Sequence, residues 1–164
     1  MTSSDKLTRL IGIDYGMARI GLSYSDPSKL IASPLAIVNA EKKAKLTIDK
    51  VKKALEKHQE ELGYRIEKII VGLPLMMNGK AGLMVDEVQH FIDLLKEAVP
   101  DVPIETWDER LTSVQAERSM REASMSRKKR SKRVDTVSAV IILQNYLDCE
   151  QLRGGPLPPI PPVA

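Results

Sequence analysis

The order of its apolar segments restricts the fold of this 164-residue chain more than any other feature. Three short segments with strand character come first, at residues 7–15, 20–24 and 32–38, and glycines between the first two indicate a hairpin. An amphipathic, lysine-rich helix is expected over 42–62, and strand, helix and strand then follow at 66–71, 85–98 and 102–107. Leading strands followed by alternating helices and strands predict one mixed sheet flanked by helices, an α/β fold.

The last part of the chain joins a basic run to a long apolar segment. A helix is expected to begin at Thr112, and the helical pattern breaks at Ser124. An apolar helix is expected from Val134 to Leu147, and residues 151–164 are rich in proline and are expected to form a disordered tail. Residues 1–150 are then a single domain. The basic run is expected to be a loop before the apolar helix, and it consists of Arg127, Lys128, Lys129, Arg130, Lys132 and Arg133.

Composition excludes several classes of protein. Hydrophobic residues make up 43% of the chain and charged residues 29%, which is typical of a globular domain rather than of a disordered one. No apolar run approaches the roughly 20 residues that cross a bilayer, so no membrane association is expected. The lone Cys149 cannot form an intrachain disulfide, which fits a reducing compartment, and a cytoplasmic location is expected. Aromatic residues are too few for a platform on which single-stranded bases would stack.

Acidic residues stand at the ends of three expected elements. Asp14 ends the first strand, Asp108 and Glu109 end the last one, and Asp135 opens the last helix. Each position also has an ordinary explanation, as a turn residue, a surface ion pair with Arg110 or a helix cap. Strand alternation places Asp108 and Glu109 on opposite faces, so only one of them is expected to point toward Asp14, and the sequence does not say which.

Together these acids could converge on one edge of the sheet and bind divalent ions. Carboxylate oxygens suit Mg²⁺ or Mn²⁺, and a pair of such ions can activate water and stabilise the leaving oxygen of a phosphodiester. Zinc is disfavoured because the chain has one cysteine, and His58 and His90 lie far apart on expected surface helices. The neighbouring basic run would hold a phosphate backbone without reading its sequence, which indicates nucleic acid as the partner.

Four sequence blocks, in order, resemble the YqgF/RuvX family of Holliday-junction-resolvase-like bacterial proteins, which are assigned to pre-16S rRNA processing. The resemblance runs from Leu10 to Asp148. Its blocks are Ile11-Gly12-Ile13-Asp14-Tyr15-Gly16 with Arg19 and Gly21, then Val71-Gly72-Leu73-Pro74-Leu75 with Asn78-Gly79, then Asp108-Glu109-Arg110-Leu111-Thr112, and finally Lys132-Arg133-Val134-Asp135 with Ala139 and Ile142-Leu143-Gln144.

The resemblance implies an RNase H-like fold and a nuclease that processes the 5′ end of pre-16S rRNA. It implies Asp14, one acid of the pair Asp108 and Glu109, and Asp135 as catalytic, metal-binding carboxylates, with Arg19, Arg110 and the basic run contacting nucleic acid. The chain departs from the family pattern at Met76 and Leu83, where a more polar residue and a proline are expected, and at Ser23, which replaces a common alanine. These departures concern loop shape and substrate fit rather than the acids.

Other functions remain open at the level of sequence. A Holliday-junction resolvase acting on branched DNA could use the same site and would be expected to act as a dimer, so both a monomer and a homodimer are compatible with the sequence. A non-catalytic RNA-binding assembly factor would bind RNA without the acids. An actin-like kinase or ATPase also opens with an Asp-x-Gly hairpin, but it needs a second such domain, and this chain has none.

Overall fold

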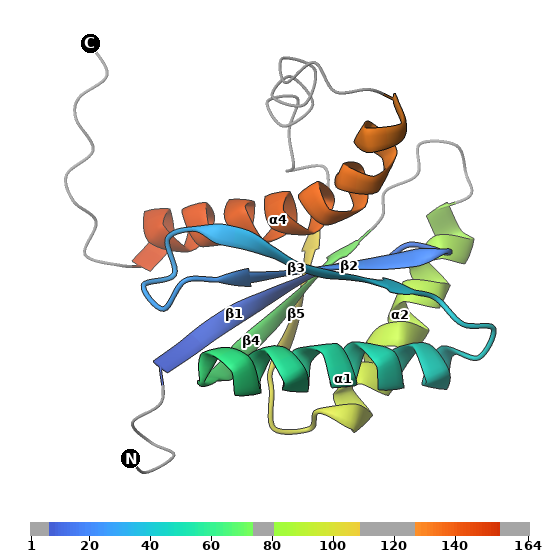
Figure 1. Ribbon diagram of the computed structural model, residues 1–164, viewed down its shortest axis with the longest axis horizontal. Coiled ribbons are helices and arrows are strands. Elements are labelled where there is room, and N and C mark those ends of the chain that lie inside the picture. Colours follow the sequence, from blue (N-terminus) through green and yellow to red (C-terminus); the bar gives the residue numbers. More distant parts are fainter. Residues whose placement is uncertain (1–6, 74–80, 109–126, 155–164) are drawn as a thin grey trace.

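The protein forms a five-stranded sheet with helices on both faces. A computed structural model describes residues 7–73, 81–108 and 127–154, and for residues 81–85, 108, 127–136 and 152–154 it describes the backbone alone. The sheet order is β3-β2-β1-β4-β5. Figure 1 shows α4 on one side of the sheet and α1 and α2 on the other. The elements are β1 (Leu7–Asp14), β2 (Arg19–Ser25), β3 (Ala32–Asn39), α1 (Ala44–Leu62), β4 (Tyr64–Leu73), α2 (Ala81–Ala98), β5 (Ile104–Asp108) and α4 (Arg127–Gly154).

Strand direction divides the sheet into two halves. β1 pairs antiparallel with β2, and β2 antiparallel with β3, as expected for a hairpin followed by a third strand. β1 pairs parallel with β4, and β4 parallel with β5, because helices connect these strands across one face. The carboxyl ends of β1, β4 and β5 therefore lie at the same edge of the sheet.

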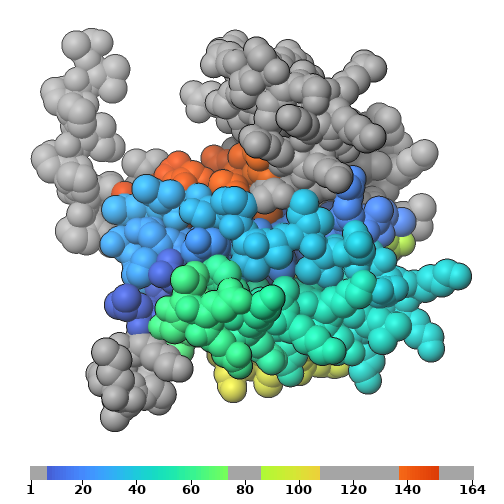
Figure 2. Space-filling model, in the orientation of Figure 1, coloured from blue at the N-terminus to red at the C-terminus, as the bar shows by residue number. Residues whose placement is uncertain are grey.

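Helix α1 buries one stripe of side chains against the sheet. Thr47, Ile48, Val51 and Leu55 are its buried residues, at the spacing of one helical face. The helix ends at Gly63, whose left-handed backbone (φ 65°) lets its amide donate to the Gln59 carbonyl at 2.7 Å. Figure 2 shows α1 and β3 side by side on one surface of the molecule.

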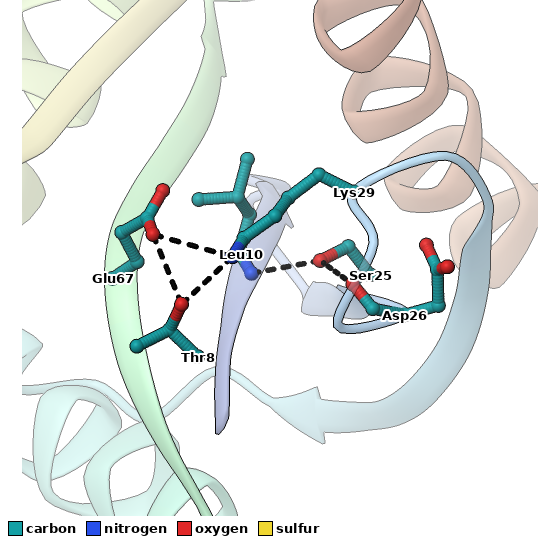
Figure 3. A network of polar contacts seen from close by, with 6 residues as sticks. All are labelled: Thr8, Leu10, Ser25, Asp26, Lys29 and Glu67. Carbon is teal, nitrogen blue, oxygen red and sulfur yellow. Dashed lines mark hydrogen bonds and ion pairs between the residues drawn. The ribbon is translucent and has the colours of Figure 1, made fainter. Parts of the chain in front are cut away.

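A bulge in β1 is held by side chains at the amino end of the sheet. The register of β1 against β4 shifts between Arg9 and Leu10. The Leu10 amide there donates to the Ser25 hydroxyl at 2.9 Å, and Ser25 in turn donates to the Asp26 carbonyl (Figure 3). Lys29 reaches across the same corner to the Thr8 hydroxyl at 2.7 Å and forms an ion pair with Glu67. These contacts fix the end of the sheet opposite to the acidic residues.

Two apolar cores lie on the two faces of the sheet. The larger one joins the sheet to α1 and α2 through residues such as Ile13, Val71 and Phe91. The smaller one lies under α4 and contains Leu10, Ile70 and Trp107. Because neighbouring residues of a strand point to opposite faces, this division tells which face each strand residue belongs to.

The structure corrects three expectations about the end of the chain. Helix α4 begins at Arg127, so the basic run forms its first two turns rather than a loop. Asp135 therefore lies in the third turn and does not open the helix. The helix continues to Gly154, so residues 151–154 are helical and not part of a disordered tail. The helix expected from Thr112 and the tail from 155 onward lie outside the described residues.

Candidate metal-binding and nucleic-acid site

Asp14 and Asp108 end two strands at the same edge of the sheet. Asp14 is paired with Gly72 of β4, and the next residue of β4, Leu73, is paired with Asp108. One strand separates the two acids, so their Cα atoms are about 10 Å apart, as two strand spacings require.

No side chain flanks Asp14 on either neighbouring strand. Its partner on β2 is Gly21 and its partner on β4 is Gly72. Paired residues point to the same face of a sheet, so the carboxylate of Asp14 projects between two positions that carry no side chain. Asp14 is itself only partly buried. An ion or a phosphate oxygen can therefore approach this carboxylate without displacing a neighbouring strand residue.

The face that Asp14 occupies is the one covered by α4. Gly12, two residues earlier in β1, shares this face and meets the helix directly: a Cβ on Gly12 would lie 2.8 Å from the Leu143 Cβ and 3.0 Å from the Ala139 carbonyl oxygen. The buried Ser23 hydroxyl on β2 donates to that same carbonyl at 2.7 Å. Helix α4 thus crosses β1 in close contact at Gly12.

The direction of α4 brings its third turn toward Asp14. Farther along the helix, the Tyr146 hydroxyl contacts Lys68 and Glu105 at 2.8 and 3.0 Å, nearer the amino ends of the strands. The helix therefore runs from the carboxyl edge of the sheet toward the amino edge. Position 135 precedes Ala139 by about one turn, roughly 6 Å, and so lies on the side of the acidic edge. The backbone of Asp135 is thereby brought to the edge that Asp14 and Asp108 share.

The basic residues expected to contact nucleic acid are partly described. Arg19 begins β2 directly after the turn that follows Asp14, and it is half-buried. Gly16 is needed in this turn because a Cβ there would lie 2.5 Å from the Arg19 carbonyl oxygen. The six basic residues from Arg127 to Arg133 lie in the first two turns of α4, just before Asp135. Glu109 and Arg110 lie outside the described residues.

The side chains of Trp107 and His58 have structural roles. Trp107 is buried and its ring meets Tyr146 edge-on at 5.6 Å, so it belongs to the core under α4 rather than to a base-stacking surface. His58 is half-buried on α1, with Nδ1 2.6 Å from the Tyr64 hydroxyl, instead of lying freely on the surface. His90 is exposed on α2. Among the side chains that the structure describes, no group of three or more His, Cys, Asp or Glu could hold a metal ion.

Residues that place α4 on the sheet are missing from the sequence-based site. Gln144 accepts a hydrogen bond from the Ala32 amide at 2.9 Å and donates to the Leu30 carbonyl at 2.9 Å, which ties the helix to the start of β3. Ser23 forms the second tie. The sequence held a signal for each tie, because Gln144 belongs to the last of the four sequence blocks and position 23 carries a serine where alanine was expected.

A separate hollow lies beside Asp14 on the other face of the sheet. Its volume is about 600 Å³, and Tyr15, the turn after β1, the segment before α1 and one side of α2 line it. Burial raises the pKa of the Tyr15 phenol, and the negative charge of Glu87 acts in the same direction. Across the described ranges, no helix is long and apolar enough to span a membrane.

Comparison with known proteins identifies the relatives of this chain. A protein from Protochlamydia amoebophila named "Putative pre-16S rRNA nuclease" is 53% identical over 148 residues, covering 90% of this chain and 98% of that protein. One of the same name from Natranaerobius thermophilus is 44% identical, covering 85% and 94%. Thermus thermophilus RuvC, solved in complex with a Holliday junction substrate, matches with a TM-score of 0.57 and 14% identity over 89% of this chain and 96% of RuvC, which shows a shared RNase H-like fold. The family model described as "RuvX: Holliday junction resolvase" matches residues 8–149, and this chain therefore belongs to the RuvX family.

Proposed function

We propose that this protein is a metal-dependent nuclease that hydrolyses phosphodiester bonds in the precursor of 16S ribosomal RNA during ribosome biogenesis in the cytoplasm. The observation that carries the proposal is the meeting of three acid-bearing positions, on β1, β5 and α4, at one edge of the sheet. The names of the two relatives support the choice of substrate.

The site is suited to hard divalent cations. Asp14, Asp135 and one acid of the pair Asp108 and Glu109 would hold Mg²⁺ or Mn²⁺, since their carboxylate oxygens are the ligands these ions prefer. The bound ions supply an activated water and stabilise the leaving oxygen. The protein's own part is to fix the carboxylates on a strand end and on a helix clamped to that strand, and to leave space beside Asp14 through Gly21 and Gly72.

Alternation along β5 favours Glu109 over Asp108 as the third ligand. Trp107 belongs to the core under α4, the face that Asp14 also occupies. The residue two positions farther shares that face if the strand pattern continues, and that residue is Glu109. We therefore expect Glu109→Gln to reduce cleavage by about 100-fold or more, a loss comparable with removal of another well-placed catalytic group. Asp108→Asn should have a smaller effect on the same rate.

The basic turns of α4 would hold the phosphate backbone next to the metals. Six lysines and arginines precede Asp135 within one continuous helix, so a bound strand is placed relative to that acid by a single rigid element. Arg19 begins β2 at the turn after Asp14 and is placed to meet the strand on the other side of the site. These contacts supply affinity without sequence selectivity, and Arg110 is assigned the same role.

Cleavage of a labelled 16S rRNA precursor tests the proposal. Wild type with Mg²⁺ or Mn²⁺ should cut the RNA, whereas Asp14→Asn and Asp135→Asn should lose cutting while their far-ultraviolet circular dichroism stays unchanged. Asp101→Asn is the matched control, since it removes an exposed acid just before β5, at the opposite edge of the sheet, and should cut normally.

A four-way DNA junction in the same assay addresses the second nuclease function, which the family description and the RuvC-like fold favour. Preferential cutting of the junction, together with a dimer in sedimentation analysis, would mean that the function is junction resolution and not RNA processing. Failure to cut either polymer, with RNA binding equal in wild type and Asp14→Asn, would refute the nuclease and leave an RNA-binding assembly factor.

A further inference from the structure

We propose that the hollow beside Asp14 is a binding pocket for one unpaired guanine of the RNA strand being cut. This inference deepens the proposed function and rests on it. The hollow of about 600 Å³ falls in the size range of small-molecule sites and opens next to the end of β1. Its lining includes Tyr15, Met17, Glu41, Glu87, His90 and Phe91.

The position of the pocket suits a base next to the bond that is cut. Tyr15 directly follows Asp14 and belongs to the face of α1 and α2, the opposite face from Asp14. The end of β1 therefore separates the proposed metal site from the pocket by a single residue. A strand whose phosphate lies at Asp14 can turn a neighbouring base over this edge into the pocket.

The walls offer an apolar surface through Tyr15 and Met17. The Phe91 ring is buried at the base of the pocket and meets the Tyr15 ring at 5.0 Å, and Tyr15 itself is half-buried. The Met17 side chain on the rim is 62% exposed, although it is large and apolar. A ring system of a nucleobase would cover these surfaces, whereas a sugar or a phosphate would leave them in contact with water.

Acidic side chains outnumber lysine in the lining of the pocket, which disfavours phosphate. Glu41 forms an ion pair with Lys50, but Asp86 and Glu87 present two exposed carboxylates from the second turn of α2. Glu87 also lies close enough to Tyr15 for its charge to raise the pKa of the phenol. Among the described side chains no group of three or more acids and histidines is arranged to hold a metal, so a cation is not the expected occupant. A ligand that covers these carboxylates must replace their water with hydrogen-bond donors of its own.

Among the four bases, guanine has the edge that a carboxylate prefers. Its ring N–H and its exocyclic amino group are adjacent donors, so one carboxylate can accept two parallel hydrogen bonds. Adenine and cytosine place an acceptor beside their amino group, and uracil has no amino group, so each would direct a lone pair at Glu87. Lys42 on the same rim supplies a donor for the guanine carbonyl oxygen.

Binding of short RNAs tests this pocket without any need for cleavage. The full chain is titrated, with EDTA present, against a fluorescent decamer of uridine that carries one central guanosine, and against the same decamer with inosine or adenosine. Inosine differs from guanosine only by the missing amino group. The guanosine RNA should bind about tenfold more tightly than the inosine RNA, because a hydrogen bond to a charged group is lost.

Two matched variants locate the effect. Glu87→Gln should bind both RNAs with equal affinity, whereas Glu97→Gln makes the same charge change about 15 Å farther along α2 and should keep the preference. Equal binding of guanosine and inosine RNA by wild type, or a preference that persists in Glu87→Gln, would overturn the pocket. Glu87 is exposed, so its replacement should leave the melting temperature unchanged.

The same RNAs with Mg²⁺ separate this inference from the proposed nuclease. Cleavage without guanine preference would support the proposed nuclease activity and refute the guanine pocket. Guanine preference in binding, without cleavage of any RNA, would support the guanine pocket and refute the proposed nuclease activity.

Discussion

Substitution of Gly12 by alanine tests whether α4 is held to the sheet at the point where it crosses β1. The added Cβ would lie 2.4 Å from the Ser23 Oγ, 2.8 Å from the Leu143 Cβ and 3.0 Å from the Ala139 carbonyl oxygen. The last two atoms are fixed to the α4 backbone, so a change of side-chain rotamer cannot move them away. The helix itself must shift.

The structure gives the size of the expected loss. Overpacking in a well-packed core costs about 1–3 kcal/mol, and the lower entropy of the unfolded chain with alanine returns about 0.4–1 kcal/mol. We expect a net loss of about 1.3 kcal/mol in the free energy of unfolding, the difference between the midpoints of these ranges, or about 3–5 °C in the melting temperature for a chain of this size. Cleavage at 25 °C should fall further than the folded fraction, because Asp135 moves with the helix and a misplacement of about 1 Å can cost about 100-fold in rate.

Ser23→Ala completes a double-mutant cycle with Gly12→Ala. Alone, this change removes the 2.7 Å bond to the Ala139 carbonyl and should cost about 1 kcal/mol. In the Gly12→Ala background, Ser23→Ala removes the closest of the three contacts. It should therefore lower the free energy of unfolding by less, or even raise it. Urea denaturation of the four proteins gives the coupling energy.

Gly63→Ala is the control for a glycine effect that does not involve α4. Gly63 has a left-handed backbone (φ +65°) and no atom within 4 Å of the added Cβ, so alanine there should cost about 1 kcal/mol through strain and leave cleavage per folded molecule unchanged. Helix α4 is not held at Gly12 if the free energy of unfolding of Gly12→Ala lies within about 0.5 kcal/mol of wild type, an amount typical of neutral surface changes, or if this variant cuts RNA at the wild-type rate.

Three further results are expected. Burial, and after it the charge of Arg9, lowers the pKa of His58 below its ordinary value of 6.5. The neutral ring therefore stabilises the folded state above pH 6.5, and this stability is lost as the ring takes up a proton. The melting temperature should drop as the pH falls from about 7.5 to about 5.5, and it should drop by less in His58→Gln. Gln144→Ala should lower the free energy of unfolding in urea by about 1–3 kcal/mol because the Ala32 amide and the Leu30 carbonyl both lose their partner. Gln144→Glu should lower it at least as much, because its carboxylate would face the Leu30 carbonyl oxygen and the Asp148 carboxylate. Replacing Arg130 by glutamine should reduce the slope of log affinity against log salt by about 0.7 for single-stranded RNA if it contacts one phosphate, and an unchanged slope would remove it from the interface.

The sheet and its helices were largely predictable because apolar periodicity reports burial. The first three strands were expected at nearly their observed limits, since each alternates or runs apolar between turn residues. Helix α4 was placed seven residues too late for a physical reason. Arginine and lysine are good helix formers, yet they carry no apolar signal, so a search for periodic burial begins only at Val134. Because the helix start was predicted too late, Asp135 was wrongly predicted to open the helix.

The site was predictable only as far as topology determines it. Parallel strands bring Asp14 and the acids after β5 to one edge whatever their side chains do, and this follows from the order of elements. The register was not available from sequence, and the register is what places glycines on both sides of Asp14. The pocket was equally inaccessible, because Tyr15, Glu41 and Glu87 come from three segments whose meeting depends on tertiary packing.

The central place of β1 in the sheet has a consequence for how the protein would lose activity on warming. Both edges of this strand are paired, to β2 and to β4, so its amides should exchange with solvent only when the whole domain opens. Asp14 therefore stands on an interior strand, held on both edges by backbone hydrogen bonds, whereas Asp135 is carried by a helix that the side chains of Ser23 and Gln144 tie to the sheet. Hydrogen exchange should show the turns of α4 around Asp135 opening well before β1, and heat inactivation should follow the opening of the helix rather than that of the strand.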